Sequence, residues 1–364
     1  MARLIEEPQD ATATQPAPIR GRGASWNPQN RFERLEYVRD EDADPDEQPA
    51  PTTVFLRDPA RSIIARNDSP DVGFEASINP YRGCEHGCIY CFARPTHEYL
   101  GFSAGLEFES KILVKEAAPE LLREELSSAR WTPQVLAISG VTDPYQPIER
   151  KLGLTRRCLQ VLAEFRNPVV IITKNHLVTR DIDVLRELAA HDAVSVALSV
   201  TTLDAELARV MEPRASTPHM RLAAIEQLAK AGIPVSVMVA PVIPAITDHE
   251  MPAILKAAAD AGARSAGFVL LRLPWNVAPR FEQWLEEHYP DRKDKVLNRL
   301  RDLRDGKLYR AEFGTRMRGE GVFAEQVEAI FNVSCRRLHL NESGFELSAA
   351  AFRRRTSQAT LFEV

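Results

Sequence analysis

The chain has 364 residues, of which 44% are hydrophobic and 27% are charged, so it has ample material for a globular core. No stretch approaches the roughly 18 uninterrupted apolar residues of a transmembrane helix, and the N-terminus lacks the apolar core of a signal peptide. The formal net charge of −5 excludes a protein that is basic overall. Five cysteines without a secretion signal argue against a disulfide framework, and we expect a cytoplasmic protein with no membrane partner.

The first fifty residues differ in composition from the rest of the chain. They hold six arginines, no lysine and eleven acidic residues, so the net charge of the whole chain arises here. Because they show no sustained apolar period, we expect residues 1–50 to form a largely disordered or loosely packed acidic arm. Composition alone explains the run RGRGA at residues 20–24 as part of a flexible arm, and contact with RNA or phosphate is the alternative.

From about residue 76 onward, short runs of Val, Ile and Leu alternate with longer segments of helical period. The predicted strands are residues 76–79, 135–139, 169–173, 194–200, 235–239 and 268–273. The predicted helices are residues 119–128, 155–165, 181–190, 217–231 and 250–261. Nearly continuous apolar strands are typical of parallel strands covered on both faces. The alternation predicts an α/β doubly wound sheet or a whole or partial barrel, with its chemistry beyond the C-terminal ends of the strands.

The segment from residue 276 to residue 364 has a different character and is predicted to be a helical C-terminal extension. Helical period dominates residues 280–305, and glycines punctuate the sequence after that. Residues 291–318 contain ten basic and five acidic residues, so this region is locally basic. A solvated, ion-paired helix surface explains this surplus, and a patch that faces phosphates is the sharper alternative.

Three of the five cysteines, Cys84, Cys88 and Cys91, fall within eight residues with the spacing C-x3-C-x2-C. Three thiolates so close together indicate metal ligands, because each ionised thiolate needs a cation nearby. A zinc site would require a fourth ligand, which His86 or His97 would supply. An iron–sulfur cluster held by only three cysteines would instead leave one iron open to a small molecule.

Residues 79–94 read NPYRGCEHGCIYCFAR, and this stretch resembles the radical S-adenosylmethionine (SAM) superfamily. Cys84, Cys88 and Cys91 match the superfamily signature, with Tyr90 as the aromatic residue before the third cysteine. The longer run, together with residues 94–101 and 139–147, resembles the spore photolyase-related branch and its uncharacterised bacterial members labelled "DNA repair photolyase". The resemblance spans roughly residues 20–362.

This resemblance implies a partial (β/α)6 TIM-type barrel, which we place at residues 51–275. It also implies a [4Fe–4S] cluster on Cys84, Cys88 and Cys91, whose open iron is chelated by SAM. The reduced cluster would cleave SAM to methionine and a 5′-deoxyadenosyl radical, which would take a hydrogen atom from a substrate. Flavodoxin or ferredoxin would serve as the reducing partner.

Polar residues at the predicted strand ends are the candidates for binding SAM. Ser139, Gly140 and Asp143 follow the 135–139 strand, where the superfamily accepts hydrogen bonds from the SAM amino group. Lys174 follows the 169–173 strand and is the candidate partner of the SAM carboxylate. Ser199 ends its strand beside the expected ribose hydroxyls. Each of these residues also has a purely structural alternative. Asp143 would form a turn, Lys174 would be a surface lysine, and the strand end at Ser199 would be an ordinary β-branched strand end.

Two further residues belong to the predicted mouth of the barrel. Tyr90 is expected to offer its backbone to the adenine edge and its ring to local packing. Arg272, at the end of the last strand, is expected to meet either the SAM carboxylate or a substrate phosphate.

The chain departs from the spore photolyases in one respect. Their hydrogen-atom-donating cysteine is expected near residues 139–143, where this chain has none. Cys158 is predicted to be a core residue, whereas Cys335 and Tyr145 are the alternative donors. Three functions stay open: a radical SAM enzyme acting on DNA or RNA, one acting on a protein or small metabolite, and a non-catalytic Fe–S or zinc protein that binds nucleic acid.

The C-terminal tail, SQATLFEV at residues 357–364, resembles the short peptides that dock bacterial proteins onto the DNA sliding clamp. The alternative is that Leu361 and Phe362 pack on the protein's own surface.

Overall fold

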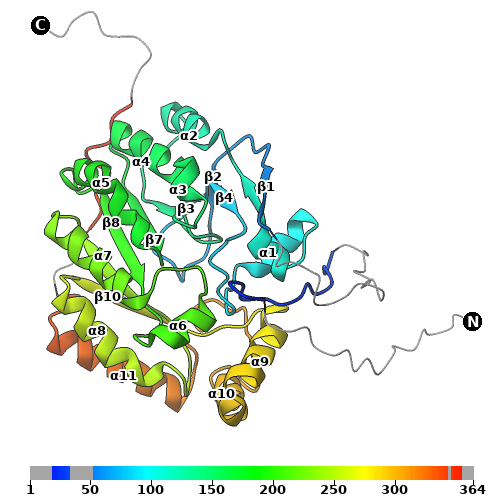
Figure 1. Ribbon diagram of the computed structural model, residues 1–364. Coiled ribbons are helices and arrows are strands. Elements are labelled where there is room, and N and C mark those ends of the chain that lie inside the picture. The colour runs from blue at the N-terminus through cyan, green and yellow to red at the C-terminus, as the bar shows by residue number, and fades with distance from the viewer. Residues whose placement is uncertain (1–18, 33–51, 343–345, 355–364) are drawn as a thin grey trace, which may run out of the picture.

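A seven-stranded sheet lies at the centre of the computed structural model, which describes residues 19–32, 52–342 and 346–354 (Figure 1). Its strand order is β10-β9-β8-β7-β6-β3-β2. The parallel strands are β3 (Ala76–Ile78), β6 (Leu136–Ile138), β7 (Val169–Thr173), β8 (Val194–Ser199), β9 (Val235–Val242) and β10 (Ser265–Leu270). The edge strand β2 (Ile64–Arg66) pairs antiparallel with β3. Six parallel strands in chain order confirm the predicted partial (β/α)6 barrel.

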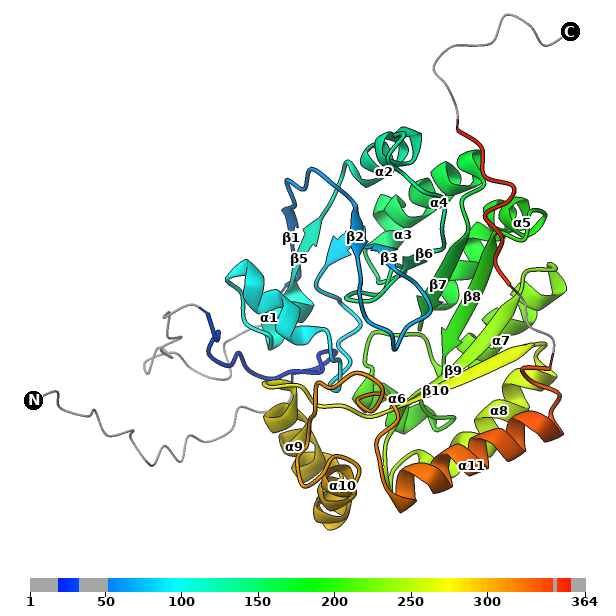
Figure 2. The ribbon, with the colours of Figure 1, turned by 180° about the vertical axis from the view of Figure 1, so that it is seen from behind.

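Helices that connect these strands cover the outer face of the sheet (Figure 2). They are α2 (Ala118–Ser127), α4 (Leu154–Phe165), α5 (Ile182–Ala189), α7 (Pro218–Lys230) and α8 (Met251–Asp260). Each matches a predicted helix to within one residue at either end. Shorter helical turns are α1 (Leu106–Ser110), α3 (Glu149–Leu152), α6 (Ala205–Met211), η1 (Arg94–Leu100), η2 (His176–Asp181) and η3 (Asp248–Glu250).

The apolar core lies between the sheet and these helices. In β7, Val169 and Ile171 are fully buried and belong to this core, whereas Val170 and Ile172 are only partly buried. Alternate residues of a strand point to opposite faces, so Val170 and Ile172 face the inside of the barrel. In β7 the face toward the inside of the barrel is therefore less fully covered than the face under the helices.

A second, three-stranded sheet was not predicted from the sequence. It consists of β1 (Val54–Arg57), β5 (Lys111–Val114) and β4 (Tyr81–Arg82), with β1 parallel and β4 antiparallel to β5. These strands have only two to four residues, too few to show a period. Because β4 leads directly into the first cysteine, this sheet positions the cysteine-containing loop.

The C-terminal region is helical, as predicted. It contains α9 (Val277–His288), α10 (Pro290–Asp302) and α11 (Val322–Arg337), and α11 packs against α8 on the outside of the barrel (Figure 2). Many of its basic side chains form ion pairs, such as Lys293 with Glu286 and Arg299 with Asp248. In the described ranges, no helix is long and apolar enough to cross a membrane.

Residues 19–32 differ from the expectation of a disordered or loosely packed arm. The Trp26 indole donates to Gln283 of α9 at 2.8 Å, and the Asn30 amide donates to the carbonyls of Glu98 and Phe102 at 3.0 Å each. These contacts use backbone groups and single polar side chains, so no apolar period in the sequence predicts them. The remainder of the predicted arm, residues 1–18 and 33–50, lies outside the described residues.

Candidate active site at the cysteine loop

The three clustered cysteines lie on one loop, residues 83–93, which we name the cysteine loop. Cys84 and Cys88 are buried, and Cys91 is partly exposed. Gly87 has a φ of +70°, and a Cβ there would lie 2.9 Å from a carboxylate oxygen of Glu109. Only glycine suits both restrictions, so the tight turn between the first two cysteines depends on it.

A buried ion pair, Arg94 with Glu109, stabilises the cysteine loop. Arg94 donates to the Cys88 carbonyl from Nε and Nη2, at 3.1 and 2.8 Å, and pairs with Glu109 at 2.5 Å. The Glu109 carboxylate also accepts the backbone N–H groups of Gly23 and Ala24, at 2.9 Å each. Both charges are fully enclosed, and such a pair is stable only because its remaining donors and acceptors are bonded.

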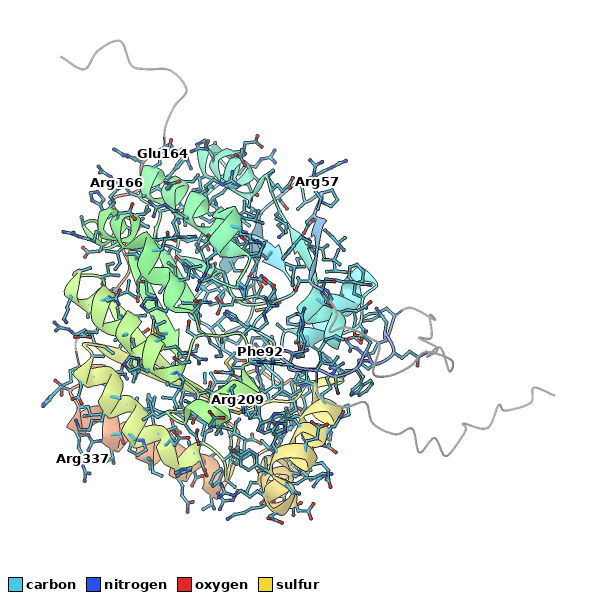
Figure 3. The ribbon with its side chains drawn as sticks, in the orientation of Figure 1. Arg57, Phe92, Glu164, Arg166, Arg209 and Arg337 are labelled. Atoms are coloured by element: carbon cyan, nitrogen blue, oxygen red, sulfur yellow. The ribbon has the colours of Figure 1, made fainter. Side chains whose placement is uncertain are left out.

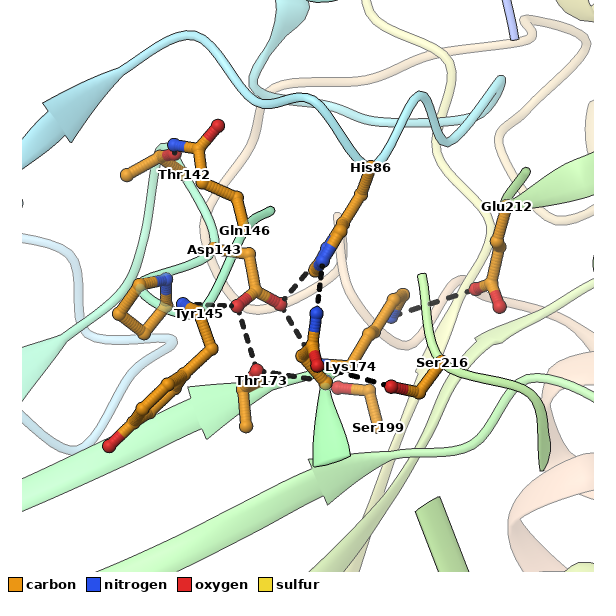
Figure 4. A network of polar contacts seen from close by, with 12 residues as sticks. His86, Thr142, Asp143, Tyr145, Gln146, Thr173, Lys174, Ser199, Glu212 and Ser216 are labelled. Atoms are coloured by element: carbon orange, nitrogen blue, oxygen red, sulfur yellow. Dashed lines mark hydrogen bonds and ion pairs between the residues drawn. The ribbon is translucent and has the colours of Figure 1, made fainter. Parts of the chain in front are cut away.

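A second network joins the cysteine loop to the ends of two strands (Figure 4). His86 Nδ1 lies 3.4 Å from a carboxylate oxygen of Asp143, and His86 Nε2 lies 3.1 Å from the Asn175 amide. Asp143 follows β6, and it accepts hydrogen bonds from the Thr173 hydroxyl at 2.7 Å and the Lys174 backbone at 2.8 Å. The Asp143 side chain therefore fixes the loops after β6 and β7 relative to the cysteines.

The electrostatics of this pair favour its charged form. Burial alone would lower the pKa of His86, but the Asp143 carboxylate and the Cys84 thiol override it and raise the pKa to about 10. Burial alone would likewise raise the pKa of Asp143, yet His86 and the hydrogen bonds from Lys174 and Thr173 lower it. The two groups stabilise each other as an ion pair at neutral pH.

Lys174 extends from the end of β7 toward the Tyr90 ring. Its Nζ donates to the Ala240 carbonyl at 3.1 Å and lies 3.9 Å from the Glu212 carboxylate. Glu212 is buried, but Arg221 and Lys174 outweigh its burial and lower its pKa to about 2. The Tyr90 hydroxyl donates to Glu212, so the buried Tyr90 ring is held in one position.

The predicted SAM-contacting residues lie at the same edge of the sheet, which we name the barrel mouth. Asp143 and Lys174 meet directly, whereas Ser139 is partly exposed and Gly140 is exposed on the loop after β6. Ser199 ends β8, and its carbonyl accepts a hydrogen bond from Arg221 at 3.0 Å. The Asp143 carboxylate is already fully bonded, which leaves backbone carbonyls near Ser139 as the acceptors for an amine. The contacts of these residues with SAM stay predictions.

The zinc alternative is not supported by the surroundings of its candidate fourth ligands. His86 faces Asp143 and Asn175, and His97 lies against the rings of Phe102 and Phe108. Within the described ranges, no three His, Cys, Asp or Glu side chains are arranged around one metal-ion position. Thiolates of an iron–sulfur cluster bind different irons and need no such common point.

The donor set fits an iron–sulfur cluster. Burial raises the pKa of Cys88 and of Cys91, so these thiols require positive charge nearby to ionise. Lys174 opposes that shift at Cys88, and Arg94 opposes it at Cys91. Three thiols on a single turn, with cations beside them, would hold three irons of a cluster.

Neither Cys158 nor Cys335 lies at the barrel mouth, and the Tyr145 hydroxyl points away from it. Cys158 is fully buried in α4, as predicted, and Cys335 is in α11 on the outer layer. The Tyr145 ring is also buried, and its hydroxyl donates to Asp181 at 3.1 Å, away from His86 (Figure 4).

Glu109 and Glu212 are important to the site, and no sequence pattern singles them out. Each acid pairs with an arginine at a distance along the chain that follows no periodic rule. His86 and Arg94 lie within the quoted motif, which is the signal that points to them.

Sequence comparison identifies relatives across most of this region. The family model of the radical SAM superfamily matches residues 78–258. An uncharacterised protein of Mycobacterium tuberculosis is 38% identical over 232 residues, which cover 63% of this chain and 67% of the relative. An uncharacterised protein of Methanocaldococcus jannaschii is 27% identical over 227 residues, which cover 62% of this chain and 81% of the relative.

Comparison with solved structures identifies the same fold in spore photoproduct lyase. One mutant of that enzyme superimposes with a TM-score of 0.58 at 18% identity and covers 78% of this chain and 79% of its own. Another, with bound AdoMet and dinucleoside spore photoproduct, gives a TM-score of 0.56 at 18% identity and covers 79% of each chain. At this identity the likeness shows the fold alone. With its cysteine motif, its partial barrel and its family match, the chain belongs to the radical SAM superfamily and is an enzyme of that class.

Proposed function

We propose that this enzyme holds a [4Fe–4S] cluster on Cys84, Cys88 and Cys91 and uses SAM to abstract a hydrogen atom from a nucleic acid, in repair or base modification. The observation that carries the proposal is the cysteine loop itself, whose three thiols include Cys88 and Cys91 near the charge of Lys174. When bound, cluster and SAM would supply a 5′-deoxyadenosyl radical, and the protein's contribution is to bind and orient the reactants.

The residues of the barrel mouth have distinct roles in this proposal. Lys174 would bind the SAM carboxylate as a point charge, because its ammonium group is held beside Tyr90 by the Ala240 carbonyl. Backbone carbonyls near Ser139 and Gly140 would accept the SAM amino group. The Asp143–His86 pair would keep the loop after β6 at a fixed distance from the cysteines. The chain would thus fix both ends of the methionine part of SAM.

The nucleic-acid substrate is supported by the shared fold with spore photoproduct lyase, one structure of which holds a dinucleoside. The chain has no cysteine near residues 139–143, and the buried Tyr145 hydroxyl is bonded to Asp181, so its hydrogen-return step would differ. A protein or small-metabolite substrate is the alternative. Membership of an enzyme superfamily argues against a purely non-catalytic role.

The test is anaerobic SAM cleavage by the reconstituted protein with dithionite. We expect 5′-deoxyadenosine from the wild type and none from Cys88→Ala, which loses a cluster ligand. Cys158→Ala is the matched control, because Cys158 is buried in α4 and should leave cleavage intact. A fully loaded wild-type cluster that cleaves no SAM would contradict the proposed chemistry.

The substrate class requires a second experiment. Turnover with SAM deuterated at the 5′ position, followed by mass spectrometry of added nucleic acid, should show labelled product if the hydrogen is returned. Label in a protein or metabolite fraction instead would favour the alternative substrate.

Proposed partners are a cytoplasmic flavodoxin or ferredoxin as reductant, and the DNA sliding clamp through residues 357–364. These tail residues lie outside the described part of the chain. A peptide of residues 350–364 should bind the clamp in fluorescence polarisation, and a peptide with Leu361→Ala and Phe362→Ala should not. Equal signals from both peptides would end the clamp proposal.

A further inference from the structure

Arg304 follows α10 and is only 1% exposed, yet most of its guanidinium donors are unused. Nη2 donates to the Leu271 carbonyl at 2.6 Å, whereas Nε and Nη1 bond to no atom of the described chain. Burial lowers the pKa of Arg304 to about 10, and the neighbouring charge of Arg272 acts in the same direction. Buried charges are normally paired, so the two free donors indicate that a ligand completes this site.

Arg272 provides a second cation with a free donor. It lies two residues after the end of β10, its guanidinium lies 4.1 Å from the centroid of the Phe92 ring, and its Nε has no partner in the described chain. Asp71 is the carboxylate that acts on Arg272, but it is already bonded to Arg316 and to the backbone N–H of Gly314. Two neighbouring arginines are therefore left with unneutralised charge.

An exposed aromatic surface continues outward from this pair. Trp275, 52% exposed, lies 5.6 Å from the Tyr309 ring and 4.3 Å from the Arg31 guanidinium. Arg31 also lies over Phe32, which stacks on Tyr99 at 4.9 Å. The Arg31 guanidinium thus lies between two pairs of rings on this surface. Nucleic-acid bases stack on such platforms whatever their sequence, because every base has a π face.

We propose that Arg272 and Arg304 form a phosphate-binding subsite at the barrel mouth, with Trp275 beside it as a stacking platform for a base. The ligand is a phosphodiester of a nucleic-acid strand, whose charge and geometry match the free guanidinium donors. Phe92, which contacts Arg272, is the residue after Cys91. A phosphate bound here therefore brings its nucleoside to the cysteine loop. This inference rests on the proposed nucleic-acid substrate.

The SAM carboxylate is the other anion that a pair of arginines at this mouth would bind. Lys174, the predicted partner of that carboxylate, is at the end of β7, and two strands separate β7 from β10. Arg304 enters from the C-terminal extension near Tyr309, whose ring lies against the exposed Trp275. This placement favours the substrate phosphate.

The test measures binding of a fluorescein-labelled 12-nucleotide oligothymidylate to the anaerobically reconstituted holoenzyme, by anisotropy at several salt concentrations. For Arg272→Gln and Arg304→Gln we expect weaker binding and a salt slope shallower by about 0.7 for each phosphate that the variant no longer binds. For Trp275→Ala we expect binding weaker by roughly 5- to 100-fold with an unchanged slope, since stacking carries no net charge. Arg337→Gln, on exposed α11 far from Phe92, is the matched control (Figure 3).

The outcomes separate this subsite from the proposed function. Arg304→Gln risks misfolding, so Arg272→Gln and the exposed Trp275→Ala carry the test independently. Wild-type binding that neither variant weakens beyond Arg337→Gln would overturn the subsite alone. No wild-type binding at all would overturn the nucleic-acid substrate with it. If Arg272→Gln weakens SAM affinity in isothermal titration and leaves oligothymidylate affinity intact, the pair binds the SAM carboxylate and the proposal fails.

Discussion

Two sets of buried charged groups at the barrel mouth differ in how fully they are paired, although Arg280, near Arg94 and Glu109, also keeps two donors without partners in the described chain. On the cysteine side, Arg94 is bonded to Glu109 and to backbone carbonyls, and His86 is bonded to Asp143. On the opposite side, Arg272 and Arg304 keep donors without partners in the described chain. The protein itself thus determines the geometry of the cysteine loop. The arginine side is complete only with a ligand that brings negative charge.

This difference has a direct energetic consequence. Removing one member of a fully bonded buried pair leaves the other charge uncompensated, which costs several times more than removing a surface ion pair. Removing a charge that has no partner relieves an existing cost. Substitutions on the cysteine side should therefore reduce stability, and those on the arginine side should reduce ligand binding.

The largest expected effect on the cysteine side comes from Glu109→Ala. It would leave Arg94 buried without its partner and two backbone N–H groups, those of Gly23 and Ala24, without an acceptor. We expect the free energy of unfolding in urea to fall by about 3–5 kcal/mol. Iron retention after reconstitution should fall as well, because Arg94 binds the Cys88 carbonyl.

Glu116→Ala is the matched control for this substitution, since Glu116 is exposed and lies 3.7 Å from the exposed Arg57. Its effect should stay within about 0.5 kcal/mol. Equal unfolding midpoints for the two variants would show that the cysteine side is not stabilised as we infer.

The acid sensitivity of the same side should depend on His97. Burial lowers the pKa of His97 to about 4, and a hydrogen bond with the Lys111 backbone and the charge of Glu107 oppose this shift. The unfolded chain binds this proton at about pH 6.5 and the folded chain only near pH 4. The associated stability is therefore complete above pH 6.5 and is lost as the pH falls toward 4.

The predicted size of this loss is at most about 3 kcal/mol, from the difference between the two pKa values, and about 2 kcal/mol of it is reached at pH 5. Urea unfolding of wild type and His97→Phe at pH 7.5 and pH 5 measures it. The variant should lose less stability than the wild type between these two pH values. His249→Phe, on an exposed histidine, should behave like the wild type. A variant as acid-sensitive as the wild type would contradict the buried neutral His97.

The barrel could be predicted from the sequence because its strands and helices have strong local signals. Every predicted strand and helix from residue 76 to residue 273 is present, with shifted ends at β9, which extends to Val242, and at β10, which begins at Ser265. The strands β1, β2, β4 and β5 escaped prediction because they are short and their stability comes from pairing between distant segments. The packing of residues 19–32 escaped for the same reason.

The candidate site divides in the same way. The cysteines are identified by their spacing, and Asp143 and Lys174 by the rule that chemistry follows strand ends. No sequence pattern points to Glu109, because its role depends on its contacts with Arg94 and with the backbone of Gly23, which is 86 residues away. Arg304 is likewise 33 residues from the Leu271 carbonyl that it binds. Only the fold brings these groups together.

Gly23→Ala tests whether residues 19–32 help to stabilise the cysteine side of the barrel mouth. A Cβ at Gly23 would lie 1.7 Å from the Gly87 carbonyl oxygen, so the segment would have to move away from the cysteine loop. Such overpacking should lower the free energy of unfolding by about 1–3 kcal/mol. Gly73→Ala is the control, because no atom lies within 4 Å of its added Cβ. Equal thermal midpoints would mean that residues 19–32 do not stabilise the loop.

The smallest effect, and the one of opposite sign, is expected for Arg272→Met. The methionine would keep an unbranched apolar side chain against Phe92 and remove a charge that has no carboxylate partner of its own. Without nucleic acid, the free energy of unfolding should therefore rise by about 1 kcal/mol, because residues kept for function often lower the stability of the fold. Excess oligothymidylate should reverse the order, because the ligand would stabilise only the wild type. A decrease in the free energy of unfolding of more than about 2 kcal/mol without ligand would show that Arg272 has partners within the protein. The charges of the arginine side would then be paired like those of the cysteine side.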